Sequence, residues 1–189
     1  MLIARTNIKG IDIKIDKLQR YMHDRLLTAW GIDTSLYKCY PRCYRNQKEK
    51  GYVPETHTGG RDYADVFVDD KLAALSFFGT GNQMVVDKDG NKKASVHLIF
   101  FVDLSQIKSG TERRDEEARL DVYKIMNYRM YGFEPSGIVT GIDSVFYEYP
   151  GSKGGFQENV NPAINYRDMH PFHCFRINLE LIYEPLLCY

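Results

Sequence analysis

The chain has 189 residues, of which 43% are hydrophobic and 26% are charged, and its 25 Lys and Arg residues balance 25 Asp and Glu residues. A chain of this length without a visible linker predicts one domain, spanning residues 1–189. The net charge of zero argues against sequence-specific nucleic acid as a partner, because phosphates are attracted by an excess of positive charge. No apolar run approaches the roughly 18 residues that cross a bilayer, and no secretory signal opens the chain, so we expect an unsecreted protein with no membrane partner.

The first predicted element is an amphipathic helix over residues 12–30, which Gly31 ends as a C-terminal cap. The apolar positions at helical spacing are Ile15, Leu18, Met22, Leu26, Ala29 and Trp30. The alternation of side chains from Tyr37 to Tyr44 then indicates a strand. Pro41 lies within this segment and cannot donate to a β-ladder, so we expect the strand at a sheet edge.

Residues 45–62 are polar and carry three glycines and one proline, which predicts a long loop. The next segment, residues 65–78, is typical of two short strands. An Asp-Gly dipeptide at 89–90 separates strand-like residues 83–86 and 94–104. This dipeptide predicts a hairpin, because both of its residues tolerate the positive φ angles of a tight turn.

Apolar residues run almost without interruption from 96 to 102, which predicts a central strand covered on both faces. A capping box then opens a second helix over residues 109–131. A further strand is expected at 138–149, followed by a second long loop at 150–171.

The last predicted strand covers residues 172–183, where apolar and polar side chains alternate. Its apolar face carries Phe175, Ile177, Leu179, Leu181 and Tyr183, and its polar face carries Arg176, Asn178 and Glu180. Such alternation is typical of an antiparallel sheet with one buried face. Together, the elements predict an α+β fold, in which two amphipathic helices back a mostly antiparallel sheet of about five to seven strands.

The two long loops, 45–62 and 150–171, point to an assembly. Connections in compact domains usually have about 2 to 6 residues, and longer loops are costly to order in an isolated chain. We therefore expect neighbouring subunits to order them, and the 14 tyrosines of the chain favour such contacts. The candidate interaction residues in these loops are Arg45, Tyr52, Arg61, Phe156, Asn161, Tyr166 and Arg167.

Several soft side chains supply enough ligands for a zinc ion. They are Cys39, Cys43, His170, His173 and Cys174. On a regular strand, however, Cys39 and Cys43 share one face at about 13 Å, which is too far apart for one ion. We therefore expect reduced, buried thiols at all four cysteines, Cys188 included, and no bound metal or other cofactor.

No known nucleophile, metalloprotease or nucleotide-binding motif occurs in the chain, so we predict no catalytic site. The G-x-G at 79–81 opens no helix, which indicates a turn and not a phosphate cradle. Residues 87–91 copy the start of a calcium-binding EF-hand. Lys92 then replaces the glycine that such a loop needs, so a hairpin turn is the preferred interpretation.

Two alternative functions remain. One is a metal-dependent hydrolase or nuclease that uses His170, His173 and a carboxylate such as Asp168. The other is a nucleic-acid-binding module, since basic and tyrosine side chains alternate over residues 40–62. Three carboxylates dilute that patch, so a protein contact or a solvated loop is the preferred interpretation of this stretch.

In element order, the chain resembles the tail-terminator or tail-completion proteins of long-tailed bacteriophages. The resemblance rests on the helix at 12–30, the hairpin sheet at 66–102, the helix at 111–131 and the final F-x-I-x-L-x-L-x-Y strand. It implies a non-enzymatic virion protein that is assembled in the host cytoplasm. It further implies a hexameric ring at the tail–neck junction, which caps the tail tube and docks to the head-side connector. The two long loops depart from the compact family pattern, and in this interpretation they reach neighbouring ring or neck proteins.

Overall fold

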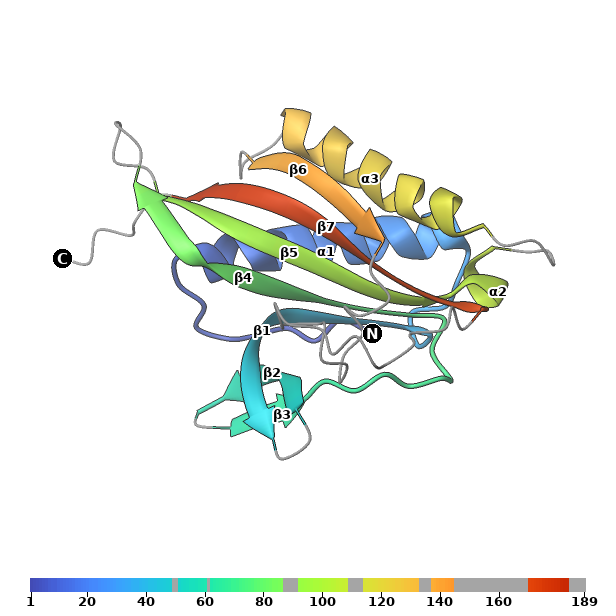
Figure 1. Ribbon diagram of the computed structural model, residues 1–189, viewed down its shortest axis with the longest axis horizontal. Coiled ribbons are helices and arrows are strands. Elements are labelled where there is room, and N and C mark those ends of the chain that lie inside the picture. The colour runs from blue at the N-terminus through green and yellow to red at the C-terminus, as the bar shows by residue number, and fades with distance from the viewer. Residues whose placement is uncertain are drawn as a thin grey trace.

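The computed structural model describes residues 1–48, 51–60, 62–86, 92–108, 114–132, 137–144 and 170–183. Figure 1 shows the helices and strands that these residues form. In chain order they are α1 (Ile11–Trp30), β1 (Tyr37–Lys48), β2 (Gly51–Gly59), β3 (Asp62–Asp65), β4 (Ala74–Val86), β5 (Lys92–Asp103), α2 (Leu104–Ile107), α3 (Asp115–Gly132), β6 (Gly137–Ser144) and β7 (Phe172–Tyr183).

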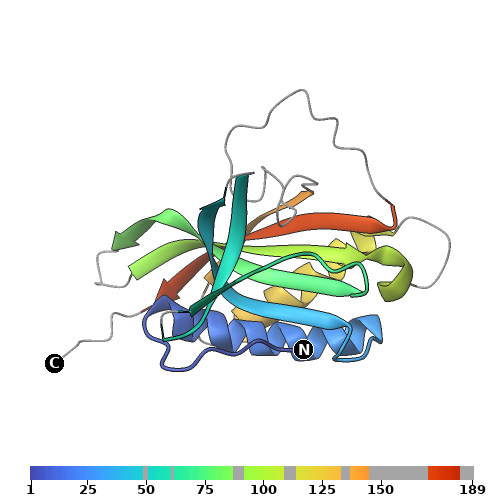
Figure 2. The same ribbon diagram turned by 90° about the horizontal axis from the view of Figure 1, so that it is seen from below.

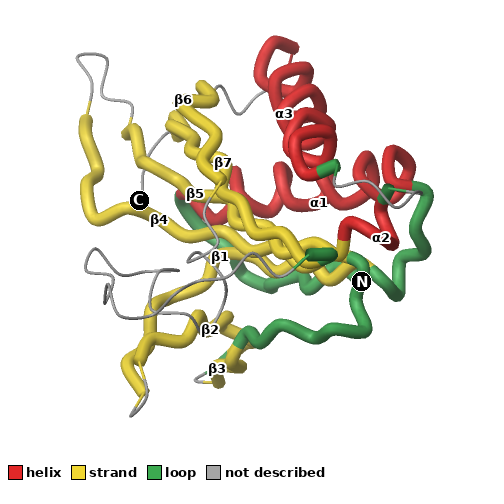
Figure 3. The backbone as a smooth tube through the Cα atoms, turned by 45° about the vertical axis from the view of Figure 1, so that its right-hand side comes forward, coloured by secondary structure: helices red, strands yellow, loops and turns green. Residues whose placement is uncertain are grey.

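The described strands form one mixed sheet of seven strands in the order β3-β2-β1-β4-β5-β7-β6. The β1–β4 pair is parallel, and the other five neighbouring pairs are antiparallel. The predicted α+β class is confirmed, although the described residues contain three helices where two were expected. Figure 3 shows the helices gathered on one side of the strands.

The apolar stripe of α1 packs on the helix-facing side of the sheet, and Figure 2 shows α1 lying along that face. Gly31 ends the helix with φ 64°, as predicted, and its N–H donates to the carbonyl oxygen of Leu27. Ala29 is exposed, so its assignment to the stripe is wrong. Two polar side chains of α1 that were not assigned to the stripe, Gln19 and His23, are buried on its sheet-facing side.

Side chains on the two faces of the sheet enter two separate cores, because successive strand residues point to opposite faces. The first core lies between the sheet and the helices and includes Phe78, Phe100 and Phe175. The second core lies on the opposite face and includes Phe77 and Phe101. Segment 66–72, which follows β3, supplies Val66 to this second core as well as the partly buried Val68 and Leu72.

The structure corrects the prediction of a long loop at 45–62. Here β1 continues to Lys48 and pairs with β2 as an antiparallel hairpin, which places Arg45 opposite Pro54. Local polarity gave no sign of this hairpin, because its strands lie at the margin of the sheet, where polar side chains face water.

The prediction that β1 is an edge strand is also wrong, since β1 lies between β2 and β4. Pro41 is tolerated because the pairing of β1 with β4 is interrupted between Cys39 and Arg42, and the pairing with β2 starts at Cys43. The interruption also shifts the alternation of side chains. Cys39 therefore enters the first core and Cys43 the second, so the expectation that they share a face is wrong.

Other predicted boundaries moved by a few residues. Of the two short strands expected over residues 65–78, the first is wrong, because β3 ends at Asp65 and no strand follows before β4. The second is confirmed as the start of β4. The G-x-G at 79–81 lies inside β4 and not in a turn, and Gly81 packs against Ser95 so closely that a Cβ would come within 3.2 Å of the Ser95 Cβ. Hairpin pairing of β4 with β5 is confirmed, while the turn at 87–91 lies outside the described residues.

The predicted terminal strand is confirmed as β7, antiparallel to both β5 and β6. The second predicted helix is confirmed as α3, with Ala118, Val122 and Met126 buried. The expected start of that helix and most of loop 150–171 lie outside the described residues.

Candidate interaction surfaces

A partly buried charge cluster joins the N-terminal segment, α1 and β1. Asp12, in the first turn of α1, lies 3.2 Å from Arg5 Nη1 and 3.0 Å from Arg42 Nε. The side chains of Asp12, Arg5 and Arg42 are 11%, 14% and 22% exposed, so solvent screens these pairs less than it screens surface pairs. The helix N-terminus also favours the carboxylate. This cluster therefore fastens β1 and the N-terminal segment to α1.

Part of the expected basic and aromatic patch is engaged in internal contacts. Besides its contacts with Asp12, Arg42 donates to the Tyr44 hydroxyl at 2.6 Å and lies 4.8 Å from the centre of the Tyr44 ring. The Tyr44 ring meets the Tyr63 ring edge-on at 6.1 Å. Tyr40 is buried in the second core. These side chains are therefore engaged within the fold, and their contacts leave less of the patch open to a ligand.

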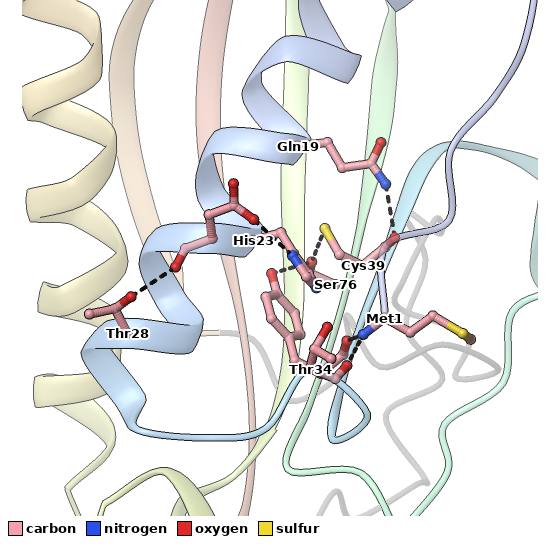
Figure 4. Close-up of polar contacts among 9 residues, drawn as sticks. Met1, Gln19, His23, Thr28, Thr34, Cys39 and Ser76 are labelled. Carbon is pink, nitrogen blue, oxygen red and sulfur yellow. Dashed lines mark hydrogen bonds and ion pairs between the residues drawn. The ribbon is translucent and has the colours of Figure 1, made fainter.

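A buried polar network ties α1 to β1 and β4, as Figure 4 shows. Gln19 Nε2 donates to the carbonyl oxygens of Ile3 and Cys39, at 3.0 and 2.8 Å. The Tyr37 hydroxyl lies 2.8 Å from Ser76 Oγ, which donates to Cys39 Sγ at 3.2 Å. Polar groups are costly to bury without partners, so these bonds fix how α1 lies over the sheet.

The same network includes the first three residues of the chain. The Ile3 N–H donates to the Cys39 carbonyl oxygen at 2.9 Å, and the Cys39 N–H donates to the Met1 carbonyl oxygen at 3.0 Å. The amino group of Met1 contacts the carbonyl oxygens of Thr34 and Tyr37. Residues 1–3 thus pair with the part of β1 that β2 does not reach.

Burial controls the chemistry of the cysteines. Cys39, Cys43 and Cys174 are buried free thiols, as expected, and Cys188 lies outside the described residues. Desolvation raises the pKa of the Cys39 thiol to about 11 and also raises the pKa of Cys43. These two thiols are therefore protonated at neutral pH, and a protonated thiol is a weak nucleophile and a weak metal ligand.

His23 is a buried polar residue that the sequence reading did not single out. Its ring stacks on Tyr37, with ring centres 5.3 Å apart, and its Nδ1 lies 3.4 Å from Asp24 Oδ1. Burial lowers the pKa of His23, because desolvation outweighs the attraction of Asp24. The neutral ring packs as part of the contact between α1 and β1.

The histidines of the alternative enzyme hypothesis differ in their surroundings. His170 is exposed, whereas His173 is buried in β7 and stacks on Phe175, with ring centres 5.7 Å apart. Asp168 lies outside the described residues. Within the described part of the chain, no three His, Cys, Asp or Glu side chains are grouped to hold a metal ion.

The end of β4 carries exposed apolar side chains. Val85 is 57% exposed and Val86 is 55% exposed. They are successive strand residues, so they point to opposite faces of the β4–β5 hairpin, and each face carries one exposed valine there. Figure 1 shows this end of the hairpin extending beyond the helices. Exposed apolar side chains at a strand end are available for contact with another chain.

An open groove lies between α1 and α3. Tyr21 and Arg25 of α1 line one wall, and Lys124 and Ile125 of α3 line the other, around a volume of about 300 Å³. The Arg25 guanidinium lies 5.5 Å from the centre of the Tyr21 ring. The groove thus combines the ring of Tyr21 and the aliphatic chain of Ile125 with two cationic side chains.

The predicted interaction residues are only partly placed by the structure. The backbones of Arg45 and Tyr52 lie in the β1–β2 hairpin, opposite Pro54 and Gln47. The side chains of both residues lie outside the description, as do all atoms of the remaining predicted positions. These positions are Arg61, Phe156, Asn161, Tyr166 and Arg167.

The exposed valines, the groove and the exposed Phe67 of segment 66–72 were not predicted from the sequence. The run of acidic residues around Phe67 was the one available signal for that position. The groove has no sequence signal, because its two walls lie about 100 positions apart in the chain and meet only through packing.

Comparison with known protein families gives no match, and comparison with curated protein sequences gives none either. Among the described residues, no helix is both long and apolar enough to span a membrane.

Proposed function

We propose that this chain is a structural protein of a bacteriophage tail–neck junction, similar to a tail terminator. In this proposal it associates into a ring, which caps the tail tube and docks to the head-side connector. It acts through protein contacts and not through catalysis, and it is assembled in the host cytoplasm before it joins the virion.

The observation that carries the proposal is the exposed end of the β4–β5 hairpin. Val85 and Val86 expose apolar surface on both faces of an extended structure, next to Lys92 and Lys93 on the paired strand. Soluble proteins usually protect strands of this kind with charges or cover them, since they otherwise pair or aggregate. The two lysines give this end part of that protection, and the valines still leave apolar surface open to a partner. A neighbouring subunit or neck protein that packs on this end would cover it.

Element order supports the same proposal. The resemblance to tail-terminator proteins relies on a first helix, a hairpin sheet, a helix after the central strand and a final alternating strand. These features correspond to α1, the β4–β5 hairpin, α3 and β7. A fold can host many functions, so the element order supports the proposal less strongly than the exposed hairpin does.

The test is the mass of the purified full chain, measured by native mass spectrometry and by light scattering over a range of concentrations. We expect a closed oligomer for the unaltered chain. We expect the double variant Val85→Asp/Val86→Asp to associate much more weakly, because charges replace the apolar contact while the folded core is untouched.

A matched control is Thr6→Asp/Asn7→Asp, which adds the same charge at two exposed successive positions without removing apolar surface. This control should associate like the unaltered chain. A folded chain that stays monomeric at high concentration would refute the proposed function.

A further inference from the structure

We infer that each copy of this chain inserts Phe67 into the groove between α1 and α3 of the next copy. The inference rests on the proposed function, because it names a second contact between subunits of the ring, in addition to the one at the end of the β4–β5 hairpin. The proposed partner is a second copy of this chain. An aromatic side chain beside carboxylates would enter a groove that has apolar side chains and two cations.

Phe67 is held in an exposed position by its neighbours. It is 58% exposed, which makes it the most exposed large apolar side chain among the described residues. On one side, Val66 is fully buried and its N–H donates to the Pro54 carbonyl oxygen at 2.8 Å. On the other side, Val68 packs against the second core. Because both neighbours are anchored, Phe67 cannot turn inward without breaking those contacts, and little conformational freedom would be lost on binding.

The segment is fastened again just beyond Phe67. The Leu72 N–H donates to the Asp69 carbonyl oxygen at 3.1 Å, and the Asp69 side chain accepts from the Lys71 N–H at 3.1 Å. Leu72 packs against the second core as well. Segment 66–72 therefore presents one aromatic side chain from a fixed backbone, which is how rigid interface anchors are built.

The groove suits an aromatic side chain. Its volume of about 300 Å³ lies at the small end of the range for binding pockets. Tyr21 and Ile125 offer a ring and a branched aliphatic chain for stacking and packing. Buried aromatic anchors of this type supply most of the binding energy in many protein interfaces.

The net charges at the two surfaces are opposite in sign. Asp69, Asp70 and Lys71 are exposed in segment 66–72, which leaves one net negative charge there, and Arg25 and Lys124 are exposed at the groove. Among the described residues, neither Arg25 nor Lys124 has a carboxylate within ion-pair distance. The chain as a whole is neutral, so these local patches attract unlike surfaces of two copies while the copies as wholes do not repel each other.

The two surfaces lie on different sides of the molecule. Segment 66–72 covers the second core, whereas α1 and α3 cover the first core on the opposite face of the sheet. Figure 3 shows α1 and α3 apart from the segment that follows β3. A chain therefore cannot fill its own groove. Contacts between unlike patches repeat from copy to copy, and they produce a ring when the rotation closes.

The first experiment measures association of the full-length variant Phe67→Ser by light scattering and native mass spectrometry, with circular dichroism to verify folding. We expect the variant to need about 30-fold higher concentration to associate, which is the loss typical of an aromatic anchor. Association at the same concentration as the unaltered chain would overturn the inference.

The second experiment reverses charges on the two surfaces. Lys124→Glu and Asp70→Lys should each weaken association by about tenfold, because each brings like charges together. The double variant Lys124→Glu/Asp70→Lys should regain most of the loss, since the charges are opposite again. If the double variant loses as much as the two single variants together, Asp70 does not face Lys124 and the inference is wrong.

The control is Lys9→Glu, which makes the same charge change at an exposed lysine outside the groove and should leave association unchanged. The design also separates this inference from the proposed function. If the unaltered chain forms a ring and the Phe67 and Lys124 variants form it equally well, the contact is wrong and the proposed function stands. If the unaltered chain is monomeric, both are wrong.

Discussion

The two ends of the central strands differ in how their faces are covered. Where β4 begins and β5 ends, the helices pack on one face and the second core forms on the other, so Phe77 and Phe100 are both fully buried. At the opposite end of the same strands, Val85 and Val86 are more than half exposed, and Ser95 is exposed beside them. One pair of strands thus passes from a doubly covered interior to an open hairpin.

The two ends of the strands therefore differ in what they contribute, one to stability and the other to the proposed contact with a neighbour. The covered end contributes most of the stability, because apolar area leaves water on both faces. The open end contributes less to folding, and in the proposed function it is the part that a neighbour would cover. The cost of a substitution should therefore fall from the covered end toward the open end, and the first substitution below tests that gradient.

The largest effect is expected for Phe100→Ala at the covered end. Phe100 stacks on Phe175 at 4.9 Å between ring centres and meets the edge of Trp30 at 6.2 Å. Removal of a buried aromatic ring leaves a cavity and typically costs about 3–5 kcal/mol. We expect a loss of that size in the free energy of unfolding, measured by urea denaturation with circular dichroism. The control at the open end is Val85→Ala, which trims a side chain that is 57% exposed and should change the stability of the monomeric chain by less than about 0.5 kcal/mol, and equal losses would contradict the gradient.

A smaller effect is expected for Asp12→Asn at the charge cluster. This variant leaves Arg5 and Arg42 close together without their carboxylate, and because the cluster is only partly buried we expect a loss of about 2 kcal/mol. In an Arg42→Gln background the same substitution should cost clearly less, since one cation is already gone. The exposed pair of Arg114 and Glu117 offers a comparison, and Glu117→Gln should leave the unfolding midpoint in urea unchanged.

Tyr37→Phe tests one hydrogen bond at the covered end. The variant keeps the ring that stacks on His23 and removes the hydroxyl that contacts Ser76. Loss of one buried hydrogen bond typically costs about 1 kcal/mol, and we expect that loss in urea denaturation. Tyr63→Phe, which removes a hydroxyl from an exposed ring, is the control. A loss no greater than that of the control would show that the contact with Ser76 is not stabilising.

The smallest effect concerns the pH dependence of stability through His23. Burial lowers the pKa of His23 in the folded chain below its ordinary value of about 6.5. As the pH falls through that ordinary value, the unfolded chain binds a proton that the folded chain resists, so stability falls. At pH 7.5 the ring is neutral in both states and this effect is absent. We expect melting temperatures measured from pH 7.5 to pH 5 to fall less steeply for His23→Gln, and parallel curves would exclude His23 as a contributor.

Local periodicity was sufficient for the regular elements of the covered core. The helical spacing from Ile15 to Leu26 predicted α1, and the alternation from Phe175 to Leu181 predicted β7, because each pattern reports which side of one element leaves water. The pattern misled at Ala29, whose side chain is exposed. An apolar stripe shows which face of a helix is buried, but it does not show at which residue the burial ends.

The candidate surfaces were largely beyond prediction, because they depend on contacts between distant segments. Asp12 and Arg42 are 30 positions apart, and no local rule links them. The exposure of Val85 depends on how far the helices extend over the sheet, which its own sequence neighbourhood does not encode. The polarity of residues 45–62 predicted a loop, although strands near a sheet edge, such as β2, are equally polar.

The chain alone therefore settles its α+β class, most of the sheet-facing side of α1, and the alternation of β7. Each of these follows from hydrophobic periodicity within one segment. Packing of the whole chain decides that β1 is internal, that Phe67 points outward, and that a groove opens between α1 and α3. The physical reason is that strand pairing and side-chain burial are set by partners far along the chain, and those partners meet only in the folded protein.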